Sequence, residues 1–65
     1  MKVKINGEDR QVKAGTVLGL LEELGLNPLA TVVEHNAHIV ARPSYPETVL
    51  ADGDIVELVR IVGGG

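Results

Sequence analysis

The last residues of the chain are the strongest candidates for chemistry. The sequence ends in Ile61-Val62-Gly63-Gly64-Gly65, an apolar pair followed by three residues without side chains. A glycine run adds nothing to a core, and it is narrow enough to thread a channel in which a Cβ atom would collide with the wall. Such a tail can deliver its α-carboxylate to another protein's active site. There, transfer to ATP gives an acyl adenylate, and attack by sulfur gives a thiocarboxylate, so the chemistry would belong to the partner.

The other polar residues make weaker candidates. His35 and His38 lie on either side of a short predicted turn, but two imidazoles fall below the three protein ligands that zinc sites generally need. We predict them to be hairpin residues partly in solvent, with no role assigned. Asp52, Asp54 and Glu57 crowd the last turn, where paired carboxylates need a dry pocket to do acid–base work. No pocket is evident, so Asp52 and Asp54 are predicted to stabilise the turn through bonds to the backbone.

Composition excludes several classes of protein. The chain has 65 residues, no cysteine, a formal net charge of −3 and one aromatic residue, Tyr45. A chain of this size is one domain without room for both a core and an enclosed active site, so we expect no autonomous enzyme and no bound metal or cofactor. Scattered basic residues and the lack of stacking side chains argue against nucleic acid. Neither a membrane span nor a signal peptide is evident, so we expect a cytoplasmic protein.

The pattern of apolar residues predicts a β-hairpin, one helix and three further strands. Period-two alternation around Asn6-Gly7 indicates a hairpin over residues 1–14, with Val12 and Ala14 facing inward on its second strand. A helix is predicted over residues 17–24, capped by Thr16 and ended by Gly25. The remaining strands are predicted over residues 31–35, 38–41 and 55–62, with an irregular crossing that Val49 and Leu50 bring into the core.

Strands with a single helix packed on one face define an α+β layer architecture. The order of these elements predicts a β-grasp domain with a mixed sheet over residues 1–62, followed by a flexible glycine tail over residues 63–65. We expect this tail to be disordered until a partner binds.

The final strand is apolar on both faces. One face carries Val56, Leu58, Arg60 and Val62, and the other carries Ile55, Glu57, Val59 and Ile61. A sheet with one helix layer would leave one of these faces exposed, and an exposed apolar patch favours a partner surface. Alternatively, the crossing or the segment "NPLA" covers it.

Three segments carry a resemblance to a known family. They are "AGTVLGLLEELGL", "VVEHNAHIVAR" and "TVLADGDIVELVRIVGGG", the last with an Asp-Gly-Asp turn, a final strand and a glycine end. Together they resemble the ThiS/MoaD family of ubiquitin-like sulfur carriers, over essentially the whole chain. The match is better to the branch that serves thiamine biosynthesis.

The resemblance implies a role for each residue of the tail. Gly65 would carry the carboxylate that is adenylated and then thiolated, while Gly63 and Gly64 would thread into the partner's active site. Val59, Ile61 and Val62 would dock the partners. These would be a ThiF-like adenylating enzyme that uses ATP, a sulfur donor such as a cysteine desulfurase, and a ThiG-like thiazole synthase. The chain itself would be a carrier acted on by enzymes.

Two alternatives stay open on the sequence. A MoaD-like carrier for molybdopterin, or for another sulfur-transfer pathway, would share the same tail chemistry. A β-grasp interaction module without carrier function would use only the docking surface.

Overall fold

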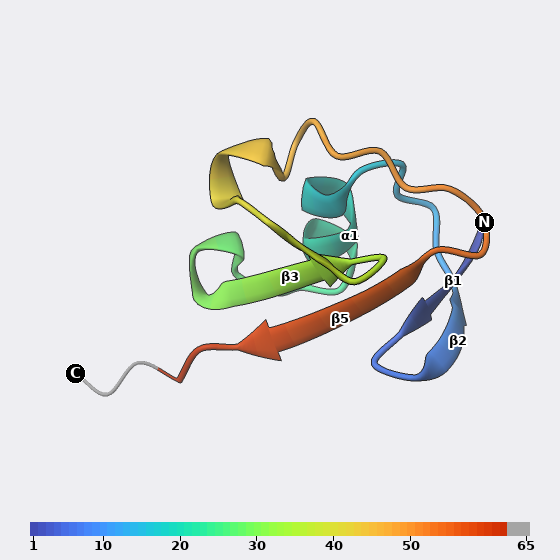
Figure 1. Cartoon of the computed structure of the whole chain (residues 1–65), viewed down its shortest axis with the longest axis horizontal. Coiled ribbons are helices and arrows are strands. Elements are labelled where there is room, and N and C mark those ends of the chain that lie inside the picture. The colour runs from blue at the N-terminus through green and yellow to red at the C-terminus, as the bar shows by residue number, and fades with distance from the viewer. Residues whose placement is uncertain (63–65) are drawn as a thin grey trace.

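A computed structural model describes residues 1–62 of the chain (Figure 1). Its element order is one hairpin, one helix, a second hairpin and a last strand, with two short 3₁₀ turns between them. The bounds are β1 Lys2–Ile5, β2 Glu8–Gln11, α1 Val17–Glu23, η1 Pro28–Ala30, β3 Thr31–His35, β4 His38–Val40, η2 Arg42–Ser44 and β5 Ile55–Arg60.

The strands form one five-stranded mixed sheet in the order β2-β1-β5-β3-β4. β5 pairs parallel with β1 and antiparallel with β3, so the last strand of the sequence is the central strand of the sheet. α1 packs on one face of this sheet (Figure 1). This confirms the predicted α+β mixed sheet with one main helix.

Local chemistry explains where the hairpin and the helix begin and end. Asn6 and Gly7 both have positive φ, at 50° and 85°, as a two-residue hairpin turn requires. The Thr16 hydroxyl accepts a hydrogen bond from the Gly19 N–H at 3.1 Å and caps α1. Gly25, at φ 71°, occupies the left-handed position beyond the helix end. These three sequence predictions are confirmed.

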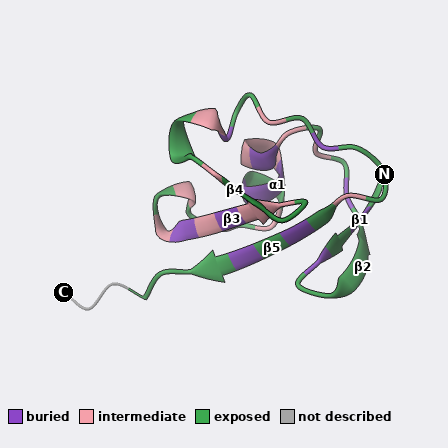
Figure 2. Ribbon diagram, viewed as in Figure 1, coloured by how far each residue is buried: buried purple, intermediate pink, exposed green. Residues whose placement is uncertain are grey.

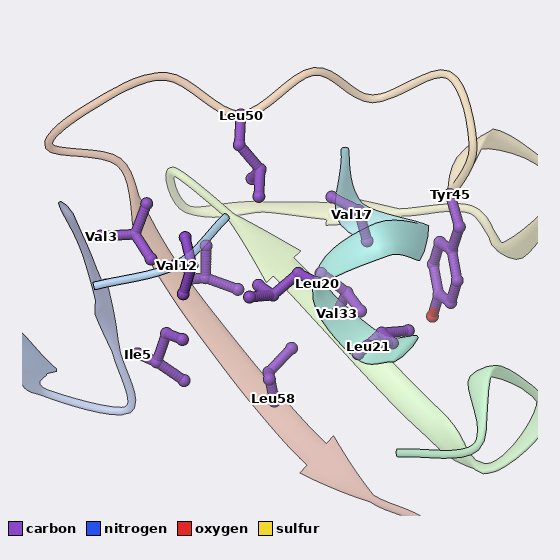
Figure 3. Packing of buried hydrophobic residues seen from close by; sticks show 11 residues of the cluster. Val3, Ile5, Val12, Val17, Leu20, Leu21, Val33, Tyr45, Leu50 and Leu58 are labelled. Atoms are coloured by element: carbon purple, nitrogen blue, oxygen red, sulfur yellow. The ribbon is translucent and has the colours of Figure 1, made fainter. Parts of the chain in front are cut away.

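The core is aliphatic and lies between α1 and the sheet (Figure 3). Leu20 and Leu21 of the helix are fully buried against Val33 and Val56 of the two central strands. Burial of each such side chain contributes about 1.5–3 kcal/mol, which a domain of this size needs. The buried hydrophobic residues are Val3, Ile5, Val12, Val17, Leu20, Leu21, Val33, Tyr45, Leu50, Val56 and Leu58.

The crossing from β4 to β5 enters the core at two points. Tyr45 is buried, and its hydroxyl donates a hydrogen bond of 2.6 Å to the Thr31 carbonyl. Leu50 is also buried, as predicted, but the prediction for Val49 is wrong, because its side chain is 70% exposed. Val49 forms an isolated backbone pairing with Thr16, and adjacent residues of an extended segment point to opposite sides.

Two predicted strands are shorter than expected. β4 ends at Val40, one residue before the predicted end and just before the 3₁₀ turn η2, and β5 ends at Arg60, two residues before the predicted end. β2 is exposed along its length, and Val12, predicted on the strand, is buried just beyond its end. The predicted tail, residues 63–65, lies outside the described residues.

Candidate functional site

β5 determines where the chain leaves the fold. The strand is held on both sides by β1 and β3, and the Ile61 N–H continues the pairing with a 2.7 Å hydrogen bond to the Ala30 carbonyl. Val62 follows and is 93% exposed. The last described residue therefore lies beyond the sheet, in a place that a partner can reach.

The face of the sheet opposite α1 is open. β5 alternates between buried and exposed residues, and the alternation is visible as purple and green bands (Figure 2). Val59 is 59% exposed and Ile55 is 49% exposed on this open face. The alternative prediction, that the crossing or "NPLA" covers these side chains, is therefore wrong. Apolar side chains left open on a small protein favour an interaction surface.

All three predicted docking residues are accessible. Val59 lies within β5, opposite Val32 of β3, and Ile61 and Val62 follow beyond the end of the strand. Each of the three side chains is at least half exposed. Val59 and Ile61 share one face by alternation and Val62 follows them in the chain, so the three make an apolar track that leads out of the sheet.

A pocket of about 420 Å³ lies beside this track. Residues 24–27, which connect α1 to η1, line it together with Ala30, Thr31, Arg60 and Ile61. Arg60 has no carboxylate within ion-pair distance among residues 1–62. A cation thus lies next to the point where the chain leaves the sheet, but no carboxylate, histidine or lysine accompanies it in the pocket lining.

His35, Asn36 and Asp54 form a hydrogen-bonded cluster at the start of β5, called the clasp below. His35 Nε2 lies 2.7 Å from Asp54 Oδ2, and Asn36 Nδ2 donates to Asp54 Oδ1 at 3.1 Å. Asn36 also accepts from the Ile55 N–H at 2.8 Å through its side-chain oxygen. The turn between β3 and β4, in which Asn36 and Ala37 both have positive φ, is thereby tied to the central strand.

The clasp perturbs the carboxyl group within it. Partial burial acts to raise the pKa of Asp54, but the hydrogen bonds with His35, the Ala51 N–H and Asn36 outweigh it and hold this pKa below its ordinary value. The ionised carboxylate of Asp54 is held by these hydrogen bonds, so it serves the structure. The prediction that Asp54 stabilises the turn is confirmed.

The remaining polar candidates do not come together. Asp52 accepts a 2.8 Å hydrogen bond from the Lys2 N–H of β1, so it ties the turn to a distant strand instead of making the local bond that was predicted. Glu57 lies on the open face. His38 Nδ1 lies 3.0 Å from the Asn36 carbonyl, at the surface. Among residues 1–62, no group of three potential metal ligands lies together. Within the same range, no helix is long and apolar enough to cross a membrane.

Sequence reasoning missed one residue of the open face. Glu34, on β3, lies directly opposite Glu57 on β5. The alternation of β3 could have assigned Glu34 to this face. It could not have shown which strand lies beside Glu34. The predicted carrier residues Gly63, Gly64 and Gly65 lie outside the described residues.

A mixed sheet with β5 as its central strand, one helix on one face and an exposed Val62 beyond the sheet define a β-grasp protein of the ubiquitin-like kind. The model of the ThiS family matches residues 3–65. The chain belongs to the ThiS family.

Relatives of similar length carry the same family name. The sulfur carrier protein ThiS of Bacillus subtilis is 37% identical, with 97% of this chain and 98% of the relative covered. The sulfur carrier protein ThiS of Escherichia coli is 32% identical, with both chains covered completely. The crystal structure of the thiamine biosynthesis protein ThiS from Geobacter metallireducens superimposes over 100% of both chains, with a TM-score of 0.85 and 30% identity.

Another group of relatives is much longer. The thiazole synthase of Paramagnetospirillum magneticum is 46% identical over 66 residues, which cover all of this chain. The chain spans only 20% of the length of that relative.

Proposed function

We propose that the chain is a sulfur carrier of thiamine biosynthesis, which brings the sulfur of the thiazole ring on its C-terminal carboxylate. The observation that carries the proposal is the family match, which extends through Gly65 and includes relatives of the same length named as sulfur carriers. These names favour the thiamine branch over a molybdopterin carrier and over an interaction module without a carrier role.

The reaction at Gly65 has two steps, both performed by partners. A carboxylate oxygen of Gly65 attacks the α-phosphorus of ATP, and pyrophosphate leaves. A sulfur nucleophile at the oxidation level of sulfide then attacks the carbonyl carbon and displaces AMP, which leaves a thiocarboxylate and releases a proton. The chain contributes no catalytic group and binds no cofactor; the ATP belongs to a ThiF-like adenylating enzyme.

The rest of the chain presents this end group. β5 leads the chain out of the sheet, and Val62 is exposed beyond it. Gly63 and Gly64 then thread the partner's channel, because neither has a Cβ atom to collide with its wall. Val59, Ile61 and Val62 dock the partner's surface, which replaces water on the apolar track.

The resemblance to sulfur carriers implies three partners. The adenylating enzyme activates the carboxylate. A donor such as a cysteine desulfurase supplies the sulfur as a persulfide, and thiols that are oxidised to a disulfide reduce it to the level of sulfide. A ThiG-like thiazole synthase takes up the sulfur. The names of the longer relatives support the last of these, since a segment similar to this chain forms part of proteins called thiazole synthase. The reactants are those of the cytoplasm, where we place the carrier.

Exchange of pyrophosphate into ATP tests the proposal. The chain is incubated with the ThiF-like enzyme, ATP and labelled pyrophosphate, and formation of labelled ATP reports reversible adenylation. We expect exchange that depends on the chain and disappears when Gly65 is deleted. Exchange that persists without Gly65, or that never depends on the chain, contradicts the proposal.

A further inference from the structure

Two carboxylates face each other on the open face of the sheet. The antiparallel register of β3 and β5 places Glu34 directly opposite Glu57, and that of β3 and β4 places Ile39 on the other side of Glu34. Directly opposite residues have Cβ atoms only about 4.5–5.5 Å apart. Glu34 is half-buried and Glu57 is exposed, so the pair opens toward solvent on this face.

The pair does not serve the fold. Like charges directly opposite on neighbouring strands are destabilising. The ion pairs within residues 1–62 are Lys4 with Asp9, at 3.5 Å, and His35 with Asp54, and neither Glu34 nor Glu57 takes part. Lys4 is the basic residue beside Ile55 on the open face, and its ammonium group lies with Asp9 on the far strand. The two carboxylates are therefore left without a cation.

Aliphatic side chains surround the pair. Val32 and Val59 are the next residues of the open face toward the chain end, and Ile39 and Ile55 flank the pair on the neighbouring positions. Ile39, Ile55 and Val59 are exposed. A partner that covers these aliphatic side chains excludes water from the two carboxylates, and the lower local dielectric then strengthens their attraction for a cation.

We propose that Glu34 and Glu57 together bind one cationic side chain, an arginine or a lysine, of the ThiF-like adenylating enzyme that takes up the glycine tail. The inference rests on the proposed function, because the same strand leads from Glu57 to Val62 and a partner that engages the tail lies along it. Arginine fits better than lysine, since its planar guanidinium group can donate to both carboxylates at once. A second copy seated symmetrically on this face would bring four carboxylates together, and an anionic lipid surface would be repelled.

The test variants remove a negative charge and leave the shape of the side chain almost unchanged. Glu34→Gln, Glu57→Gln and the double variant are compared with Glu47→Gln, which removes one exposed charge from the crossing instead of the sheet. For each, the KM and kcat of the chain are measured in ATP–pyrophosphate exchange with the ThiF-like enzyme at low and at high salt. Thermal unfolding is measured in parallel.

The double variant should raise KM by about 5- to 10-fold at low salt with kcat unchanged, and high salt should erase the difference. Its Tm should rise by about 2–4 °C, because the repulsion is gone. Glu47→Gln should change KM by less than about twofold.

An unchanged KM for the double variant overturns the inference and leaves the proposed function intact. A fall in its Tm also overturns it, since the carboxylates would then serve the fold. A wild-type chain that supports no exchange at all overturns the proposed function, and the inference with it.

Discussion

The side chain of Asn6 pairs with the backbone of Leu58 as a strand residue would. Its Oδ1 accepts from the Leu58 N–H at 2.8 Å, and its Nδ2 donates to the Leu58 carbonyl at 3.2 Å. β1 ends at Ile5, so without Asn6 the central strand would lack partners on that side at Leu58. The same residue also holds the positive φ of the hairpin turn.

Asn6→Ala should therefore lower the free energy of unfolding by about 2 kcal/mol, because it leaves a partly buried N–H and C=O unpaired. Urea denaturation measures the loss. Asn6→Gly, which accepts positive φ without strain, separates the two roles of the residue. We expect Asn6→Gly to lose most of the free energy of unfolding that Asn6→Ala loses, because the hydrogen bonds dominate. An Asn6→Gly variant as stable as wild type would contradict this role for the amide.

Tyr45→Phe should lower stability by about 1–2 kcal/mol. The variant removes the buried hydroxyl that donates to the Thr31 carbonyl, while the ring stays in the core. For a domain of this size the change corresponds to a fall in Tm of about 4–8 °C per kcal/mol, which calorimetry resolves. An unchanged Tm would show that the crossing is held by packing alone.

Because of Asp54, the free energy of unfolding should fall as the pH is lowered into the acid range. Its pKa is lower in the folded state than the ordinary value of 3.8, so its contribution is complete above that value and is lost as pH falls through the folded pKa. Asp54→Asn should be less stable than wild type at neutral pH, and the two should converge in strong acid. Glu47→Gln serves as control and should parallel wild type throughout. A constant difference between Asp54→Asn and wild type down to strong acid would contradict the clasp.

Val59→Asp should weaken docking without unfolding the chain. The side chain is exposed on the open face, so the substitution places a charge where we propose that an apolar partner surface lies. The KM for adenylation should rise about 10-fold. Val49→Asp is a matched control, because Val49 is equally apolar and exposed but lies on the crossing. Equal effects of the two variants would remove Val59 from the docking surface.

Gly64→Ala should lower kcat/KM for adenylation by about 10- to 100-fold with unchanged Tm. On the threading that we propose, a Cβ atom at this position would collide with the wall of the partner's channel, and small misplacement of a reacting group has effects of that size. Single-turnover kinetics with the ThiF-like enzyme give the measurement. A fully active Gly64→Ala variant would contradict threading, although not the carrier chemistry at Gly65.

Much of the fold could be predicted because its local chemistry is explicit. Asn6-Gly7 requires a hairpin, and Thr16 and Gly25 mark the ends of the only α-helix in residues 1–62. The Val49 prediction failed because the crossing has no regular period, so the sequence did not indicate which of two neighbouring apolar residues points inward.

Only part of the candidate site could be predicted from the sequence. Alternation along β5 placed Val59 and Ile61 on one face, and the structure leaves both accessible. The pairing of Glu34 with Glu57 could not be predicted, because register between strands far apart in the sequence depends on the whole sheet. The hydrogen bond between Asn6 and Leu58 could not be predicted for the same reason, since 52 positions separate the two residues.

The most direct test of the central claim is the intact mass of the chain after incubation with ATP, a sulfur donor and the adenylating enzyme. Exchange of one carboxylate oxygen for sulfur adds about 16 Da. Because oxidation at Met1 adds nearly the same mass, fragmentation must localise the gain, and a thiol alkylator must react with it. The account predicts an alkylatable gain on Gly65 that is absent when Gly65 is deleted. A terminus that stays unmodified with an adenylating enzyme active on another ThiS carrier would contradict it.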